Sequence, residues 1–348
     1  MKRDSAIMRC AVVLMSLVVV TCAAAQTSSW SLIVRLNPAV DEIISADAKV
    51  EKLAGDFGFL EGPVWVRKGG YLIFSDIPAN VIRKWNPQDG KVSVFLPYSG
   101  FTGTDDSIAG MQVNNGRSVV SLLGSNGVTV DPQGRVVYCA HGDRQIVRLE
   151  EDGSRTVLAN KYEGKRLNSP NDLVYKSDGS LYFTDPPSGH RNQSASDPTR
   201  DLPFNGIYLL KNGKLQLLDQ TFDRPNGLAF TPDEKYLYVN DTHRKIIVRF
   251  EVEPDDTITH GKVFIDMNSD EAPGGPDGMK VDQKGNVYCT GPGGLWIMSS
   301  EGRHLGTILM SELPANLAFG GADGRTLFLA ARTGSLFRIP LKIPGIAP

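Results

Sequence analysis

Asn226-Gly227-Leu228-Ala229-Phe230 is the clearest copy of a pattern that recurs through this chain. An oxygen-bearing side chain opens the pattern, a short β-type stretch follows, and a turn then leads into a second strand. The other copies are Glu61-Gly62-Pro63-Val64-Trp65, Asn126-Gly127-Val128-Thr129-Val130, Asn171-Asp172-Leu173-Val174-Tyr175, Asp277-Gly278-Met279-Lys280-Val281 and, more faintly, Asn316-Leu317-Ala318-Phe319. Six copies indicate six equivalent structural modules.

The spacing of the copies predicts the fold. They begin at residues 61, 126, 171, 226, 277 and 316, so the intervals run from 39 to 65 residues. Propeller blades repeat every ~40–50 residues. Turns rich in Gly, Asp and Pro separate short β-branched and aromatic runs, which indicates antiparallel hairpins. The chain is therefore predicted to be an all-β, six-bladed β-propeller.

The sequence also predicts the structure of the segments outside the repeat. Residues 97–116 and 186–203 are rich in turn-forming residues, and we expect both to be loops rather than added elements. Residues 49–54 look like an N-terminal strand that closes the last blade beside residues 335–339. A single propeller domain is thus predicted for 49–348, preceded by an extension over 26–48 with at most one short helical turn, over residues 38–45.

The first 25 residues have the composition of an export signal. Lys2 and Arg3 precede an apolar run over residues 11–20, and Ala23-Ala24-Ala25 supplies small residues for cleavage before Gln26. We expect a secreted or periplasmic protein with no membrane attachment after cleavage; a membrane anchor, or lipidation of Cys22, is the alternative. The net charge of −2, without a basic stripe, argues against a nucleic-acid partner. Oligomeric state is not predicted.

The opening residues of the modules predict a metal site. The first strand of each propeller blade lines the central channel, so these residues should meet at one axial point. Calcium binds six to eight oxygens from carboxylates, amides and water. The oxygen-bearing residues are Glu61, Asn126, Asn171, Asn226 and Asp277. We predict one divalent metal ion, calcium first, with zinc, magnesium and manganese as alternatives; the lack of His and Cys argues against a dedicated zinc site.

An ordinary turn is the competing explanation for these residues, because Asn-Gly and Asp-Gly are common turn dipeptides. For Asn126 this explanation is favoured, and the residue is kept as an accessory substrate contact. Asn316 is expected only to pack.

Two further residues follow second strands of neighbouring modules. His141 and Asp185 are predicted to reach the channel mouth and contact substrate, because a His there can bind a substrate oxygen or move a proton. The alternative for His141 is a loop histidine bonded to Asp143. Asp76 and Asp241 also follow second strands and are weaker candidates for substrate contact.

The remaining predictions concern side chains away from the axis. Arg144 is expected on a solvated strand, while Cys139 and Cys289 are expected to be buried free thiols.

The motifs resemble the gluconolactonase, regucalcin and luciferin-regenerating enzyme family of six-bladed propellers. The matching stretches are Glu61-Gly62-Pro63-Val64-Trp65, Ser169-Pro170-Asn171-Asp172, Arg224-Pro225-Asn226-Gly227 and Pro276-Asp277-Gly278-Met279. The resemblance implies a single divalent metal held by Glu61, Asn226 and Asp277, with Asn171 as a further ligand or a substrate contact. Ser169 stands where the animal members carry Arg, so the chain looks like the bacterial branch.

No serine-nucleophile, P-loop or dinucleotide-binding pattern is present in the sequence. The lead hypothesis is a secreted metal-dependent hydrolase that opens a lactone or another sugar-derived small molecule, with Asp277 as general base. An esterase or other hydrolase on the same propeller, acting for example on a phosphotriester or aryl ester, is one alternative, and a sugar lyase is another. A non-catalytic sugar- or calcium-binding propeller is the third.

Overall fold

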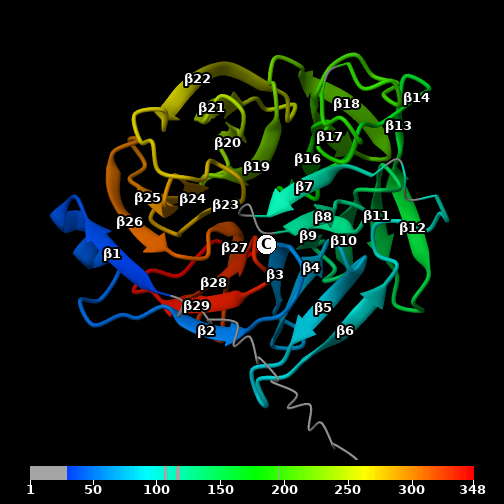
Figure 1. Ribbon diagram of the computed structural model, residues 1–348. Helices are drawn as coiled ribbons and strands as arrows, with labels where there is room; N and C mark the ends of the chain where they lie inside the picture. Colours follow the sequence, from blue (N-terminus) through cyan, green and yellow to red (C-terminus); the bar gives the residue numbers. More distant parts are fainter. Residues whose placement is uncertain (1–29, 106, 108, 115–117, 195) are drawn as a thin grey trace, which may run out of the picture.

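The computed structural model describes residues 30–105, 107, 109–114, 118–194 and 196–348 (Figure 1). The predicted signal segment and its cleavage point lie outside these residues. In the described part, no helix is long and apolar enough to cross a lipid bilayer.

Six antiparallel sheets surround a central channel, which confirms the predicted six-bladed propeller. Blade 1 contains β3 (Leu60–Val66), β4 (Tyr71–Asp76), β5 (Val81–Trp85) and β6 (Val92–Pro97). Blade 2 contains β9 (Ser125–Val130), β10 (Val136–Ala140), β11 (Gln145–Leu149) and β12 (Arg155–Ala159). Blade 3 contains β15 (Leu173–Tyr175), β16 (Leu181–Asp185), β17 (Gly206–Lys211) and β18 (Lys214–Asp219).

The second half of the ring repeats this order. Blade 4 contains β19 (Pro225–Phe230), β20 (Tyr236–Asp241), β21 (Ile246–Val252) and β22 (Ile258–Asp266). Blade 5 contains β23 (Met279–Val281), β24 (Val287–Gly291), β25 (Gly294–Met298) and β26 (His304–Met310). Blade 6 contains β27 (Pro314–Gly320), β28 (Thr326–Ala331) and β29 (Leu336–Pro340). The first strand of each blade is innermost, and neighbouring inner strands contact one another around the ring.

An N-terminal strand closes blade 6, as the sequence predicts. β2 (Glu51–Ala54) pairs antiparallel with β29, with Glu51 opposite Arg338. The blade thus receives its outer strand from one part of the chain and its three inner strands from another. Sharing a sheet in this way joins the first and last blades through backbone hydrogen bonds.

The segment before β2 contains the one short helical turn that was predicted and a strand that was not. β1 (Ser31–Arg35) adds a fifth strand to blade 5 by pairing with β26, and a 3₁₀ helix, η1 (Pro38–Glu42), follows it. Val40, Ile43 and Ile44 are buried in the core between blades 5 and 6. The predicted domain boundary at residue 49 therefore does not separate this segment from the propeller.

One of the two predicted loops contains a hairpin, and that prediction was wrong. β7 (Met111–Asn114) and β8 (Ser118–Ser121) pair antiparallel within the insertion between blades 1 and 2. The described residues of the second insertion, 186–203, form no strand, as predicted. The Gly110 N–H donates to the Gly189 carbonyl at 2.8 Å, so the two insertions contact each other. A further short hairpin, β13 (Lys161–Tyr162) with β14 (Lys165–Arg166), follows blade 2.

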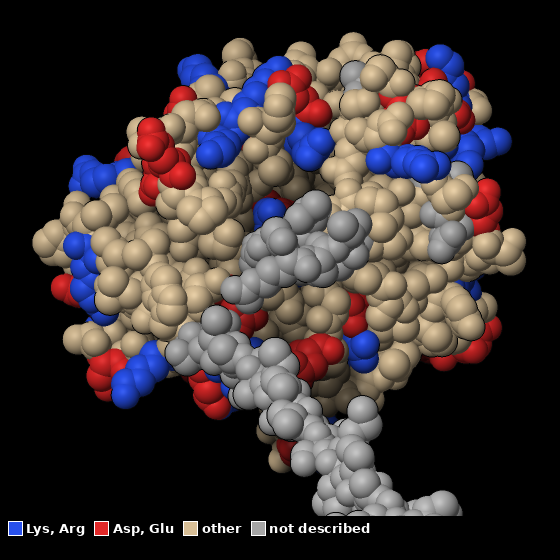
Figure 2. Space-filling view, in the orientation of Figure 1, with Lys and Arg blue, Asp and Glu red and all other residues tan. Residues whose placement is uncertain are grey.

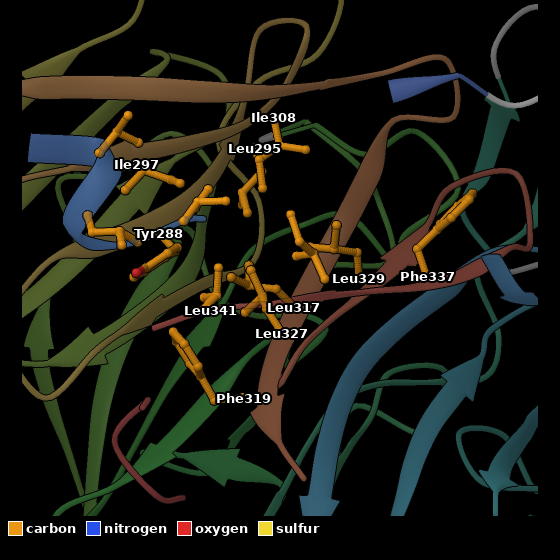
Figure 3. Packing of buried hydrophobic residues seen from close by; sticks show 14 of the residues in the cluster. Tyr288, Leu295, Ile297, Ile308, Leu317, Phe319, Leu327, Leu329, Phe337 and Leu341 are labelled. Atoms are coloured by element: carbon orange, nitrogen blue, oxygen red, sulfur yellow. The ribbon is translucent and has the colours of Figure 1, made fainter. Parts of the chain in front are cut away.

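The hydrophobic core is divided into clusters between neighbouring blades. Figure 3 shows the cluster between blades 5 and 6, where Tyr288 and Leu295 of blade 5 lie near Leu317 and Leu329 of blade 6. Cys139 and Cys289 are buried in two other clusters and carry free thiols, as predicted. Burying apolar side chains between blades holds the inner strands at fixed positions around the axis.

Candidate functional site

The six opening residues of the repeat form a buried ring at one end of the channel. Each lies in or just before the first strand of its blade, and each is at most 6% exposed. The ring members are Glu61, Asn126, Asn171, Asn226, Asp277 and Asn316. Figure 2 views the molecule in the orientation of Figure 1; its face is hollowed near the centre, with acidic and basic side chains at the edge of the hollow.

Glycine after the ring residue allows neighbouring blades to approach closely. The Gly227 N–H donates to the Asp277 carbonyl at 3.1 Å, and the Gly127 N–H donates to the Asn171 carbonyl at 2.7 Å. A Cβ added at Gly227 would lie 2.1 Å from the Asp277 carbonyl oxygen. Only a residue without a side chain fits this contact, so the repeated glycine fixes the spacing of the ring.

Three carboxylates meet at the ring. Glu61 Oε2 accepts from Asn316 Nδ2 at 2.9 Å, and the same nitrogen lies 3.4 Å from Asp172 Oδ2. Asp277 Oδ2 accepts from Arg332 Nη2 at 2.7 Å. Asn316 therefore does more than pack, and that expectation was wrong.

Burial disfavours the charged forms of these acids. Burial and repulsion from Asp277 raise the pKa of Glu61 well above its usual range. Burial also raises the pKa of Asp277 to about 6, although the Arg332 guanidinium opposes the rise. Burial raises the pKa of Asp172, with the nearby Lys280 acting in the opposite direction. The three carboxylates therefore repel one another in their charged forms, and a bound cation would relieve that repulsion.

Two ring amides have oxygens suited to a cation. Asn226 Nδ2 donates to Thr242 Oγ1 at 3.1 Å, and its Oδ1 is buried without a partner in the described part of the chain. Asn126 Oδ1 is likewise buried and unpartnered among the described residues. Buried acceptors are normally satisfied, so orphaned oxygens beside carboxylates fit a hard divalent cation. The ring offers oxygen donors of the kind that a divalent cation binds, and the metal site itself stays a prediction.

A second group of candidate ligands lies at the outside of blade 4. Atoms of Glu251, Glu253 and His260 come within 4.8 Å of one another on or beside β21 and β22. Glu251 and His260 are exposed. Exposed acidic groups are common without a metal, and these residues lie on the outer strands, away from the channel. The axial ring is therefore the better candidate.

A cavity of about 340 Å³ lies at the opposite end of the channel from the ring. It is lined by the far ends of the inner strands and by residues 346–348 of the C-terminal segment, and Figure 1 places the C-terminus near the axis. Its lining is mostly apolar side chains such as Val128 and Leu228. It offers no cluster of acids for hydrolysis.

His141 lies next to the ring but makes a different contact from its predicted alternative. It follows β10, is 1% exposed, and places Nδ1 3.0 Å from the Pro170 carbonyl oxygen. Asp143 instead accepts from Thr102 Oγ1 at 2.9 Å, so the interpretation of His141 as a loop histidine bonded to Asp143 was wrong. Burial lowers the pKa of His141 to about 4, which keeps the imidazole neutral at neutral pH.

Asp185 performs a structural function that recurs in the propeller. Its Oδ2 accepts from the Asn168 N–H at 2.7 Å, just ahead of the inner strand of its blade. Asp76 accepts from the Gly58 N–H, and Asp241 from the Asp223 N–H, at equivalent positions. Burial raises the pKa of Asp185 to about 7. A substrate contact for Asp185 remains a prediction that this geometry does not favour.

The structure also adds residues that the sequence did not single out. Asp172 occupies the place that Gly takes in four other copies of the repeat, and this exchange was a usable signal. Arg332 follows β28 and had no such signal. Arg144 was expected in solvent but is 8% exposed and donates to the Leu167 carbonyl at 2.6 Å.

The similarity to known proteins extends over the ring residues and into all six blades. The model of the SMP-30/Gluconolactonase/LRE-like region matches residues 59–333. A gluconolactonase of Zymomonas mobilis is 36% identical over 316 residues, covering 87% of this chain and 85% of that protein. A pentonolactonase of Haloferax volcanii is 23% identical over 280 residues, covering 79% and 81%. The solved structure of a gluconolactonase from Xanthomonas campestris superposes with a TM-score of 0.73 at 31% identity, covering 89% of this chain and 94% of that one.

Proposed function

Since the chain belongs to the SMP-30/Gluconolactonase/LRE-like family, we propose that it is a divalent-cation-dependent hydrolase that opens a lactone ring. The observation that carries the proposal is the buried ring of carboxylates with orphaned amide oxygens at the channel mouth. The gluconolactonases of Zymomonas mobilis and Xanthomonas campestris support the substrate class.

Glu61, Asn226 and Asp277 would hold the cation, with Asn171 as a further ligand or substrate contact. Asn126, with its unpartnered oxygen, is an accessory candidate. Calcium suits an all-oxygen donor set best; zinc, magnesium and manganese are the alternatives. A divalent cation in this position supplies a Lewis acid for the substrate carbonyl and stabilises the oxyanion.

Asp277 is proposed as the general base. Arg332 donates to its Oδ2 and thereby orients the carboxylate at the channel mouth. Asp277 accepts a proton from water as the water oxygen attacks the carbonyl carbon. The ring C–O bond then breaks, the leaving oxygen takes the proton back, and the product is a hydroxy acid.

We also propose that the protein is exported and acts on a small molecule outside the cytoplasm. The support is the sequence of residues 1–25, with its charged start, apolar run and small residues before Gln26. N-terminal sequencing of protein recovered from the medium or periplasm tests this proposal. An N-terminus upstream of residue 20 would contradict it.

A pH-stat assay tests the reaction. Lactones and simple esters are supplied to the wild type, to Asp277→Ala and to a control, Asp233→Ala, which changes an exposed turn acid. Each is assayed with chelator and after calcium, zinc or manganese is restored. We expect wild type and control to open lactones only with a cation, and Asp277→Ala to be inactive with its β-sheet circular dichroism unchanged.

Three results would count against the proposal. Full activity of chelated enzyme or of Asp277→Ala would refute the mechanism. Turnover of esters but not lactones would favour an esterase. Cation binding without turnover of any substrate would favour a binding module.

A further inference from the structure

We propose that His141 and His190 form a hydroxyl-binding pair that selects polyhydroxylated lactones over lactones without hydroxyl groups. The inference rests on the proposed function and deepens it by naming the substrate class. Two buried imidazoles line the same cavity of about 180 Å³, and each has one ring nitrogen without a partner among the described residues. His190 belongs to the insertion between β16 and β17, which is not part of the repeat.

The contacts of His141 fix its tautomer. Its Nδ1 faces the Pro170 carbonyl, which can only accept a hydrogen bond, so Nδ1 carries the proton. The ring is neutral, and Nε2 therefore presents a lone pair. This nitrogen is shielded by the protein and bonded by no described group. His141 Nε2 is therefore a hydrogen-bond acceptor that a ligand donor would satisfy.

The contacts of His190 give the same result by another route. The Thr199 hydroxyl donates to Asp197 Oδ1 at 2.5 Å, so Thr199 Oγ1 accepts from His190 Nδ1 at 2.7 Å. The ring is 3% exposed, and its Nε2 is also bonded by no described group. Burial and the neighbouring Arg144 lower the pKa of His190 to about 4, so this ring is also neutral at neutral pH.

The chemistry of the pair points to hydroxyl groups. Two bare nitrogens accept hydrogen bonds and cannot donate them, so a carboxylate or phosphate would gain nothing from them. Hydroxyls can donate to both. Zinc is the other ligand for such nitrogens, but structural zinc needs about four ligands. No described Cys, Asp, Glu or third His joins the two rings within 4.8 Å.

The pair lies beside the candidate metal centre. His141 directly follows Ala140, which pairs with Ser125 next to Asn126 of the ring. His141 is therefore about one strand spacing, ~4.8 Å, further from the axis than the ring residues. Its partner Pro170 immediately precedes Asn171. A lactone with its carbonyl at the ring can extend its hydroxyls toward the pair.

Asparagine and glutamine variants test the pair. His141→Asn and His190→Asn keep an amide near the Nδ1 position and remove the Nε2 acceptor, while His141→Gln restores an oxygen near Nε2. The substrates are glucono-δ-lactone and δ-valerolactone, which has no hydroxyls. Each asparagine variant should lower kcat/KM for glucono-δ-lactone about tenfold, mainly through KM, as the loss of one neutral hydrogen bond predicts. The δ-valerolactone rate should not change, and His141→Gln should recover part of the loss.

The outcomes separate the two proposals. Equal losses on both lactones, or no loss on either, would overturn the histidine pair and leave lactone hydrolysis intact. A wild type that opens neither lactone would overturn the proposed function.

A spectroscopic readout does not depend on variant folding. Gluconate added to wild-type protein should shift the ¹⁵N resonances of both Nε2 atoms. Unshifted resonances at saturating gluconate, or shifts with zinc alone, would refute the inference.

Discussion

Replacing Gly227 with alanine should damage the site through a steric clash of known size. The added Cβ would lie 2.1 Å from the Asp277 carbonyl oxygen and 2.9 Å from Asn240 Nδ2. Nonbonded atoms prefer separations of about 3.5–4.0 Å, so the Asp277 backbone would have to retreat by at least about 1.4 Å. The clash is with backbone on one side and a buried side chain on the other, and neither can move aside freely.

The displacement acts directly on the proposed catalytic geometry, because Gly227 follows Asn226 and touches Asp277. A misplacement of about 1 Å can cost about a hundredfold in rate. We therefore expect kcat/KM of Gly227→Ala to fall about a hundredfold, equivalent to about 2.7 kcal/mol of transition-state stabilisation. Overpacking should also lower the free energy of unfolding by about 1–3 kcal/mol.

The matched control is Gly153→Ala. Gly153 has a φ of +83° and nothing within 4 Å of an added Cβ, whereas Gly227 has no positive φ, so the control measures backbone strain without a clash. The control should lose about 1 kcal/mol of stability and keep its kcat/KM. Lactone hydrolysis is measured well below the melting temperature of each variant. A folded Gly227→Ala protein within twofold of wild-type kcat/KM would refute the steric reasoning.

Three further predictions concern stability. Asp256 is 1% exposed and binds Lys176 at 2.5 Å, while the Lys176 side chain is partly exposed, so Asp256→Ala should lower the urea unfolding free energy by about 1–3 kcal/mol; an unchanged midpoint would contradict this. His141 titrates near pH 4 folded and near 6.5 unfolded, so only the unfolded state gains its proton as pH falls from 6.5 to 4. Stability should drop by about 3 kcal/mol over that window, and a His141→Asn urea series that falls equally would disprove the assignment. Glu61→Gln removes one buried charge, so in the presence of chelator the variant should have a higher melting temperature than wild type. Added calcium should raise the melting temperature of wild type only. The reverse order in calorimetry would count against the ring as a cation site.

The repeat allowed the blades to be predicted, because each copy carries its own strand pattern and turn. β1 was missed because residues 31–35 belong to no copy and gain their partner, β26, from a distant part of the chain. The hairpin of β7 and β8 was missed although Asn115-Gly116 between them is a strong hairpin signal in sequence. The segment was predicted as a loop because its composition is rich in turn-forming residues, and the dipeptide was given less weight.

The ring residues were predictable for the same reason, since repeat register places them at one end of the channel. Asp172 could have been found from the replacement of glycine in one copy. Arg332 and His190 could not, because the Arg332 contact with Asp277 joins two blades and the His190 contact with Thr199 depends on how the insertion between β16 and β17 folds. Local pattern carries no information on such contacts.

The shared sheet of blade 6 has a consequence for how the chain folds. Glu51 and Arg338 pair across 287 residues, so β2 has no partner until β29 has been made. Closing so long a loop carries an entropy cost that local hairpins do not have. Blades 1 to 4 are each built from one continuous segment and can form during synthesis. Closure of the ring is then expected to be the slow step, during which the unpaired edges of β2 and β29 are the surfaces most exposed to aggregation.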